Sequence, residues 1–143
     1  MTYFDIQKAF GGVGRSLAAT LDYDYVLNGY DDNGPYVMDP SKSYVRLDVI
    51  WNEKNRTNLD NGSGSLANHP LQVKVMVRKS IVTNGAGENL SFRAACALNQ
   101  AQLVFYEGLE LASAKVFKTY PSPLLFEDNH IGYALTVVVE SIE

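Results

Sequence analysis

The chain has 143 residues, of which 46% are hydrophobic and 20% charged, and its formal net charge is −4. This length fits one domain, residues 1–143, with enough apolar material for a core that needs no disulfide or metal staple. A single cysteine excludes an internal disulfide, and the negative charge argues against a general nucleic-acid-binding protein. We expect no signal peptide and no membrane span of roughly 20 apolar residues. The protein is therefore expected to be made and used in a reducing cytoplasm.

The first element is predicted to be a helix from Tyr3 to Leu21. Apolar residues recur there at helical spacing; they are Ile6, Phe10, Val13, Leu17 and Leu21. Gly11, Gly12 and Gly14 interrupt this pattern, and each costs about 1 kcal/mol relative to alanine inside a helix. Either the helix breaks at these glycines, or the small residues let another backbone approach closely.

The next segment, residues 22–39, is rich in tyrosine, aspartate and turn dipeptides. Asn28-Gly29 and Asn33-Gly34 suit tight turns, because both residue types tolerate a positive φ. We therefore predict a small exposed N-terminal hairpin, with Tyr23–Leu27 and Pro35–Met38 as its two strands.

Two segments alternate strictly between apolar and polar residues, Tyr44–Trp51 and Leu71–Lys79. Such alternation predicts antiparallel strands with one buried face. The buried faces would carry Val45, Leu47, Val49 and Trp51 on the first strand and Leu71, Val73, Val75 and Val77 on the second. The polar stretch between them, Asn52–Pro70, is too long for a tight turn and predicts a functional or mobile loop.

A turn at Asn84–Gly87 is expected to lead into a second helix, Glu88–Glu107, which Gly108 would cap. Two more strands are predicted at Leu111–Thr119 and Gly132–Ile142. The predicted fold class is therefore α+β: a mainly antiparallel four-stranded sheet with two helices packed on one face, plus the small N-terminal hairpin.

Charge is distributed unevenly along the chain. Residues 1–40 and 94–143 each hold two basic and six acidic side chains, whereas residues 41–93 hold eight basic and four acidic ones. This is either chance scatter over a solvated surface, or the mark of a protomer with one positive and one negative side that suits head-to-tail contacts. The candidate interface residues are Arg46, Arg56, Lys74, Arg78, Asp31 and Asp32.

No catalytic, cofactor or metal site is expected. Gly11–Ser16 resembles a phosphate-binding loop but lacks a preceding strand and the usual lysine. Asp31–Gly34 resembles the start of a calcium loop without its further acidic ligand, which favours a solvated turn. Cys96 lies among alanines in the second helix, so an inert core thiol is favoured over a nucleophile paired with His69 or His130.

One order of elements runs through nearly the whole chain. The N-terminal helix is followed by a proline-containing approach to a strand, a glycine-containing loop, a strand, one long helix, a proline-containing segment and a final strand opened by an aromatic residue. These are Pro40–Trp51, Asn58–Ser65, Leu71–Lys79, Gly85–Gly108, Tyr120–Pro123 and Tyr133–Val137. In this order and spacing the chain resembles the tail terminator (tail completion) proteins of long-tailed bacteriophages, from which the glycines of the first helix and segment 22–39 depart.

The resemblance implies a structural virion protein without catalytic residues, assembled in the host cytoplasm and located in the tail or neck. Such a protein forms a ring, typically a hexamer, that caps the tail tube and joins it to the head. Its partners would be further copies of itself, the tail tube protein and a neck or connector protein, with DNA passing through the lumen without specific binding. The alternatives are another head–tail connector or neck component, a cytoplasmic binding module for an anionic ligand or peptide, and a small hydrolase or transferase that uses the glycine cluster.

Overall fold

The computed structural model describes residues 3–49, 57–58, 65–79, 87–111 and 115–142. These residues form an α+β fold of two helices, α1 (Tyr3–Leu21) and α2 (Gly87–Leu111), and one mixed sheet. Its strands are β1 (Asp24–Leu27), β2 (Tyr30–Asp31), β3 (Gly34–Pro35), β4 (Tyr44–Val49), β5 (Thr57–Asn58), β6 (Ser65–Arg78), β7 (Lys115–Pro121), β8 (Leu125–Phe126) and β9 (His130–Ile142). No helix in these ranges has the length and apolar character that crossing a lipid bilayer requires.

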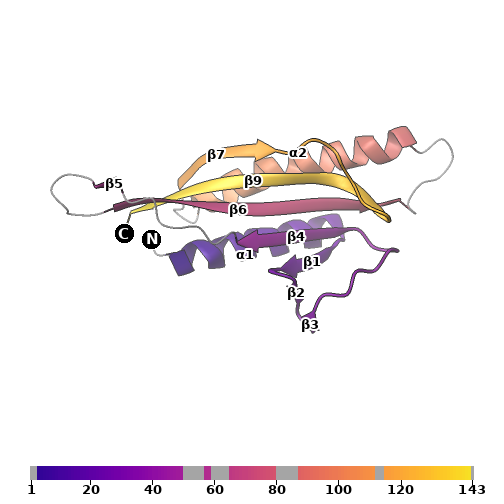
Figure 1. The fold of residues 1–143 in the computed structure, drawn as a ribbon, viewed down its shortest axis with the longest axis horizontal. Coiled ribbons are helices and arrows are strands. Elements are labelled where there is room, and N and C mark those ends of the chain that lie inside the picture. The colour runs from indigo at the N-terminus through magenta and orange to yellow at the C-terminus, as the bar shows by residue number, and fades with distance from the viewer. Residues whose placement is uncertain (1–2, 50–56, 59–64, 80–86, 112–114, 143) are drawn as a thin grey trace.

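The sheet is built around the long antiparallel pair of β6 and β9. The two strands pair without a break from Leu66 opposite Ile142 to Arg78 opposite His130. At 14 residues, β6 spans roughly 45 Å. The strand order is β3-β2-β1-β4-β6-β9-β7, with β5 added to β6 and β8 added to β9. Figure 1 shows this pair running along the molecule, with α1, β4 and β1 on one side of it and α2 and β7 on the other.

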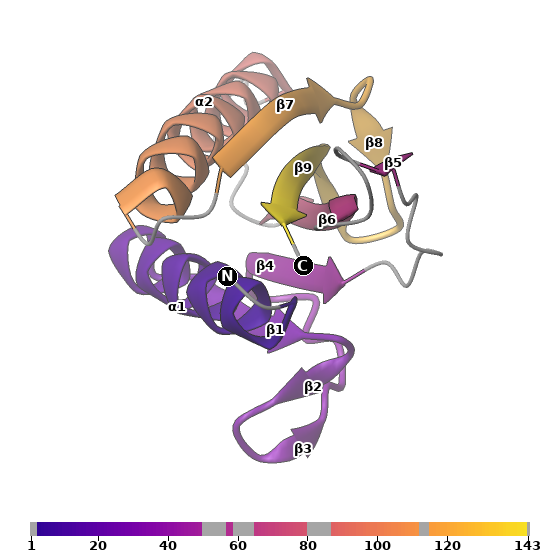
Figure 2. The same ribbon diagram turned by 90° about the vertical axis from the view of Figure 1, so that its left-hand side faces the viewer.

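Both helices cover the same face of the sheet, as the sequence predicts (Figure 2). The alternating residues of β4 and β6 point toward them, and Val45, Leu47 and Val73 are fully buried. The rings of Phe10 from α1 and Phe105 from α2 meet with their centroids 5.4 Å apart. One hydrophobic core therefore joins the two helices to the inner sheet face.

Helix α1 continues unbroken through its glycine cluster. A Cβ atom at Gly14 would lie 2.3 Å from Cδ2 of Leu47, and the Tyr25 hydroxyl donates a hydrogen bond of 3.1 Å to the carbonyl oxygen of Gly11. The small residues thus let β4 and β1 approach the helix closely, which is the second of the two expectations.

Gly108 has a similar role in α2, and its prediction as a helix cap is wrong. The helix continues to Leu111, and a Cβ atom at Gly108 would lie 2.6 Å from Cγ2 of Val13 in α1. The glycine therefore marks the close approach of the two helices rather than the end of one.

The prediction of a mainly antiparallel four-stranded sheet is wrong in detail. β1 and β4 pair in parallel, from Asp24 opposite Tyr44 to Leu27 opposite Leu47. The segment Tyr23–Leu27 therefore lies within the main sheet, whereas the predicted hairpin joined it to Pro35–Met38. The two observed tight pairings are β1 with β2 and β2 with β3. A parallel pair needs a partner distant in sequence, which local alternation and turn dipeptides do not reveal.

Strand boundaries also differ from those predicted. β6 begins at Ser65, so residues 65–70 of the expected loop belong to this strand, and residues 66–70 pair with β9. β7 extends to Pro121, where the edge position of the strand tolerates a missing N–H donor. The remainder of the loop except β5, the tryptophan at position 51 and the turn at 84–86 lie outside the described residues.

Candidate assembly surfaces

Arg46 and Lys74, two of the predicted interface residues, are neighbours on the sheet face that points away from the helices. They are directly opposite each other in the β4–β6 pairing. The Nε atom of Arg46 lies 2.9 Å from Oδ2 of Asp48, and the Lys74 ammonium pairs with the Glu127 carboxylate. Each of these two cations therefore has an acidic partner beside it.

A buried polar network lies next to this pair. The Tyr44 hydroxyl donates a hydrogen bond of 2.6 Å to Oε1 of Glu127, and the Tyr44 ring packs edge-on to His130 at 4.9 Å between centroids. Nε2 of the fully buried His130 lies 2.7 Å from the carbonyl oxygen of Lys42. Because a carbonyl oxygen only accepts, Nε2 donates this hydrogen bond. The network ties the turn before β9 to β4 and to the segment that precedes it.

The pKa values of the network match this structural role. Burial raises the pKa of Tyr44, and the neighbouring carboxylate of Glu127 raises it further. Burial alone would raise the pKa of Glu127, but hydrogen bonds from Lys74 and Tyr44 outweigh that effect and lower it. The sequence predicts that the last strand begins at Gly132, whereas β9 begins at His130, whose side chain is enclosed. Its position directly before an alternating segment was the signal that could have revealed this.

Residues 28–40, named the arm from here on, project from the body of the molecule (Figures 1 and 2). They include β2 and β3 and expose Tyr30, Val37 and Met38, with 83% of Val37 accessible. The arm also holds three acidic residues, Asp31, Asp32 and Asp39, and no basic one. It therefore combines apolar contact area with a negative charge.

The arm is held in place by specific contacts at both ends. Asn28 and Gly29 take φ values of 53° and 85° in the tight turn between β1 and β2. Arg15 of α1 donates hydrogen bonds of 2.9 and 2.8 Å to the two carboxylate oxygens of Asp32, which lower the pKa of that carboxyl group. The Tyr36 hydroxyl bonds to Asp24 at 3.2 Å. These contacts tie the arm to α1 and β1.

Asp31 and Asp32 thus lie in the arm, whereas Arg46 lies on β4 and Lys74 and Arg78 lie on β6. Asp31 accepts a hydrogen bond of 2.8 Å from the backbone N–H of Asn33, so its carboxylate stabilises the turn that the sequence favoured over a calcium loop. Within the described ranges no three histidine, cysteine or acidic residues are grouped so as to hold a metal ion. Arg56 lies outside the described residues.

Helix α2 carries an exposed apolar stripe opposite its buried face. Its members, named the α2 face from here on, are spaced alternately by four and three residues, which places them on one side of a helix. They are Phe92, Cys96, Asn99, Leu103 and Tyr106, and 69%, 57% and 52% of Phe92, Leu103 and Tyr106 are accessible. The prediction that Cys96 is a core thiol is therefore wrong, because its side chain is exposed.

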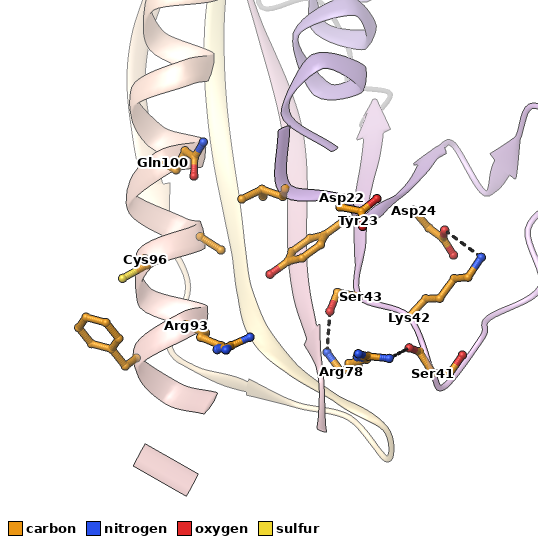
Figure 3. Close-up of a pocket in the computed structure, with 13 residues that line it drawn as sticks. Asp22, Tyr23, Asp24, Ser41, Lys42, Ser43, Arg78, Arg93, Cys96 and Gln100 are labelled. Atoms are coloured by element: carbon orange, nitrogen blue, oxygen red, sulfur yellow. Dashed lines mark hydrogen bonds and ion pairs between the residues drawn. The ribbon is translucent and has the colours of Figure 1, made fainter. Parts of the chain in front are cut away.

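A cleft of about 560 Å³ lies beside the N-terminal half of α2 (Figure 3). Arg93 points into it from α2, while Cys96 points away to the outer side of the helix. Arg78, the third basic strand residue, also lines the cleft and bonds to Ser41 through its guanidinium group. Lys42 contributes from the facing segment, so three cations from separate elements meet here.

Comparison with known proteins supports the fold and goes no further. No family model matches the chain, and no curated protein matches it either. One solved structure, 12% identical in sequence, superposes on 100% of this chain and 96% of its own with a TM-score of 0.52. At that identity the likeness shows a shared α+β architecture alone.

Proposed function

We propose that this chain is a structural virion protein, a phage tail terminator that forms a ring of six copies, as in the family that it resembles, caps the tail tube and joins it to the head. The observation that carries the proposal is the order of elements. An N-terminal helix, a strand, a long strand, one long helix and a closing strand pair follow each other as they do in the family that the sequence resembles. The arm is an addition to that order.

Two features of the described surface support a role in assembly. The arm and the α2 face are different apolar surfaces, and the arm and α2 lie on opposite sides of the β6–β9 pair (Figures 1 and 2). A protomer with two different contact surfaces assembles head to tail, and such a contact closes into a ring when the rotation permits. DNA would pass through the lumen without specific contacts, in keeping with the net charge of −4.

The proposal is tested with the tail tube protein of the same phage, polymerised with and without this chain. We expect that tubes grown with the chain stop lengthening and carry a ring at one end in negative-stain electron micrographs. Unchanged tube lengths and bare tube ends in the presence of assembled rings would contradict the terminator role. Rings that bind a head connector but no tube would instead favour another neck component.

A binding module for an anionic ligand or peptide is the second candidate, and the cleft favours it. Arg93, Arg78 and Lys42 line the cleft, but Asp22 and Asp24 line it too, and Lys42 lies 3.9 Å from Asp24. Thermal unfolding in rising concentrations of inorganic phosphate tests this candidate, with Arg93→Gln as the matched control. A saturable rise in melting temperature that Arg93→Gln removes would favour it, and no rise would count against it.

A further inference from the structure

Two surfaces account for most of the exposed large apolar side chains. Among the described residues, every strongly exposed large apolar side chain except Tyr120 and Phe126 lies on the arm or on the α2 face. Concentrations of this kind, rimmed by polar residues, are typical of protein–protein contact sites rather than of ordinary solvated surface.

The two surfaces of one molecule do not meet each other. The arm and α2 lie on opposite sides of the β6–β9 pair in both views (Figures 1 and 2). The bidentate pair of Arg15 with Asp32 ties the arm to α1. A partner for either surface must therefore come from another molecule.

Charge indicates which end of the α2 face an acidic arm would contact. The N-terminal half of α2 holds one acidic residue, Glu88, and one basic residue, the exposed Arg93, whereas the C-terminal half holds the exposed Glu107 and Glu110 and no basic residue. The arm carries three acidic residues and no basic one. Electrostatic complementarity therefore favours the end with Phe92 and Cys96 and disfavours the end with Tyr106.

We propose that the arm of one copy docks on the N-terminal half of the α2 face of the next copy. Val37 and Met38 cover the apolar surface around Phe92 and Cys96, and the arm carboxylates lie near Arg93. The contact joins two different surfaces, so it repeats head to tail. This inference rests on the proposed ring, for which it names the contact between neighbouring protomers.

Cysteine cross-linking tests the contact directly, because Cys96 is the chain's single cysteine and lies on the α2 face. Under mild oxidation Val37→Cys is expected to give a ladder of disulfide-linked dimers, trimers and larger species on a non-reducing gel. The double variant Val37→Cys with Cys96→Ser removes the acceptor and should lose the ladder. Ala19→Cys, an exposed position on α1, is the matched control and should give no ladder.

The other outcomes have equally definite meanings. A ladder no stronger than that of Ala19→Cys, whether the protein is monomeric or already a ring, would overturn the contact. The original protein could also form disulfide-linked dimers through Cys96 alone. If their yield equalled that of the Val37→Cys variant, the contact would be overturned too, because such dimers mean that two α2 faces meet. A ring without the Val37→Cys ladder refutes the contact and leaves the terminator role standing, whereas a ladder of open chains that never close refutes the ring.

Charge reversal at Arg93 provides an independent measurement. Arg93→Glu should raise the dissociation constant of self-association by about tenfold or more, because the arm then meets a like charge. Circular dichroism verifies that the variant is folded, as expected for an exposed side chain. Sedimentation that is unchanged from the original protein would count against the assigned end of the α2 face.

Discussion

The glycine cluster of α1 offers a prediction in which the same substitution has opposite effects at neighbouring positions. Gly12→Ala places a methyl group where no atom lies within 4 Å, so only helix propensity changes. Alanine is favoured over glycine inside a helix by about 1 kcal/mol, and Gly12→Ala should stabilise the fold by that amount. At Gly14 the same methyl group would lie 2.3 Å from Cδ2 of the fully buried Leu47.

Since the propensity gain is common to both variants, the difference between them measures the packing conflict alone. Forcing a methyl group into a filled core costs about 1–3 kcal/mol, so Gly14→Ala should be less stable than Gly12→Ala by that margin. Urea unfolding followed by circular dichroism measures both free energies under the same conditions. If Gly14→Ala proved as stable as Gly12→Ala, the close approach of α1 to β4 would be refuted.

Three further predictions follow from the described contacts. Glu127→Gln should destabilise the fold by about 1–2 kcal/mol at neutral pH, because Lys74 loses its ion-pair partner. The pKa of Glu127 is lowered in the folded state, so its carboxylate stabilises the fold at pH values above the ordinary pKa of 4.5, and this stabilisation is lost as the pH falls through the folded-state pKa. The free energy of unfolding of Glu127→Gln should therefore depend less on pH in that acidic range than that of the original protein. An equal dependence would contradict this. Gly132→Ala should lower the free energy of unfolding by about 3 kcal/mol or more, measured with urea, because the added Cβ atom would lie 2.0 Å from the backbone oxygen of Val75. A urea midpoint close to that of the original protein would show that the β6–β9 pairing is misplaced. Cys96 should react with a thiol reagent in the folded monomer, and reaction only on unfolding would contradict its exposure.

The helices show what periodicity can and cannot reveal. The bounds of α1 follow from apolar residues at helical spacing, and the structure confirms Tyr3–Leu21. Cys96 was assigned to the core from its alanine neighbours in sequence. Adjacent residues on a helix point in directions about 100° apart, so Ala94 and Ala97 can be buried while Cys96 is exposed. The spacing of Phe92, Cys96 and Leu103 carried the correct signal, because it marks a second stripe on the side of the helix opposite the buried one.

The sheet and the polar network depended on contacts that a single sequence does not display. The inner faces of β4 and β6 follow from alternation and are confirmed, whereas the parallel pairing of β1 with β4 joins segments separated by the whole arm. Tyr44, Glu127 and His130 come together only because β9 returns beside β6 and the turn before it folds against β4. No local pattern links such residues, so the contacts among them could not be predicted from the sequence.

The central proposal is a closed head-to-tail ring, and the mass of the assembled protein is its most direct test. Size-exclusion chromatography with light scattering, over a hundredfold range of protein concentration, should show one discrete species. For six copies of the 15.8 kDa chain its mass would be about 95 kDa, and it should not grow further with concentration. A strict monomer at every concentration, or a continuous series of ever larger masses, would contradict the account.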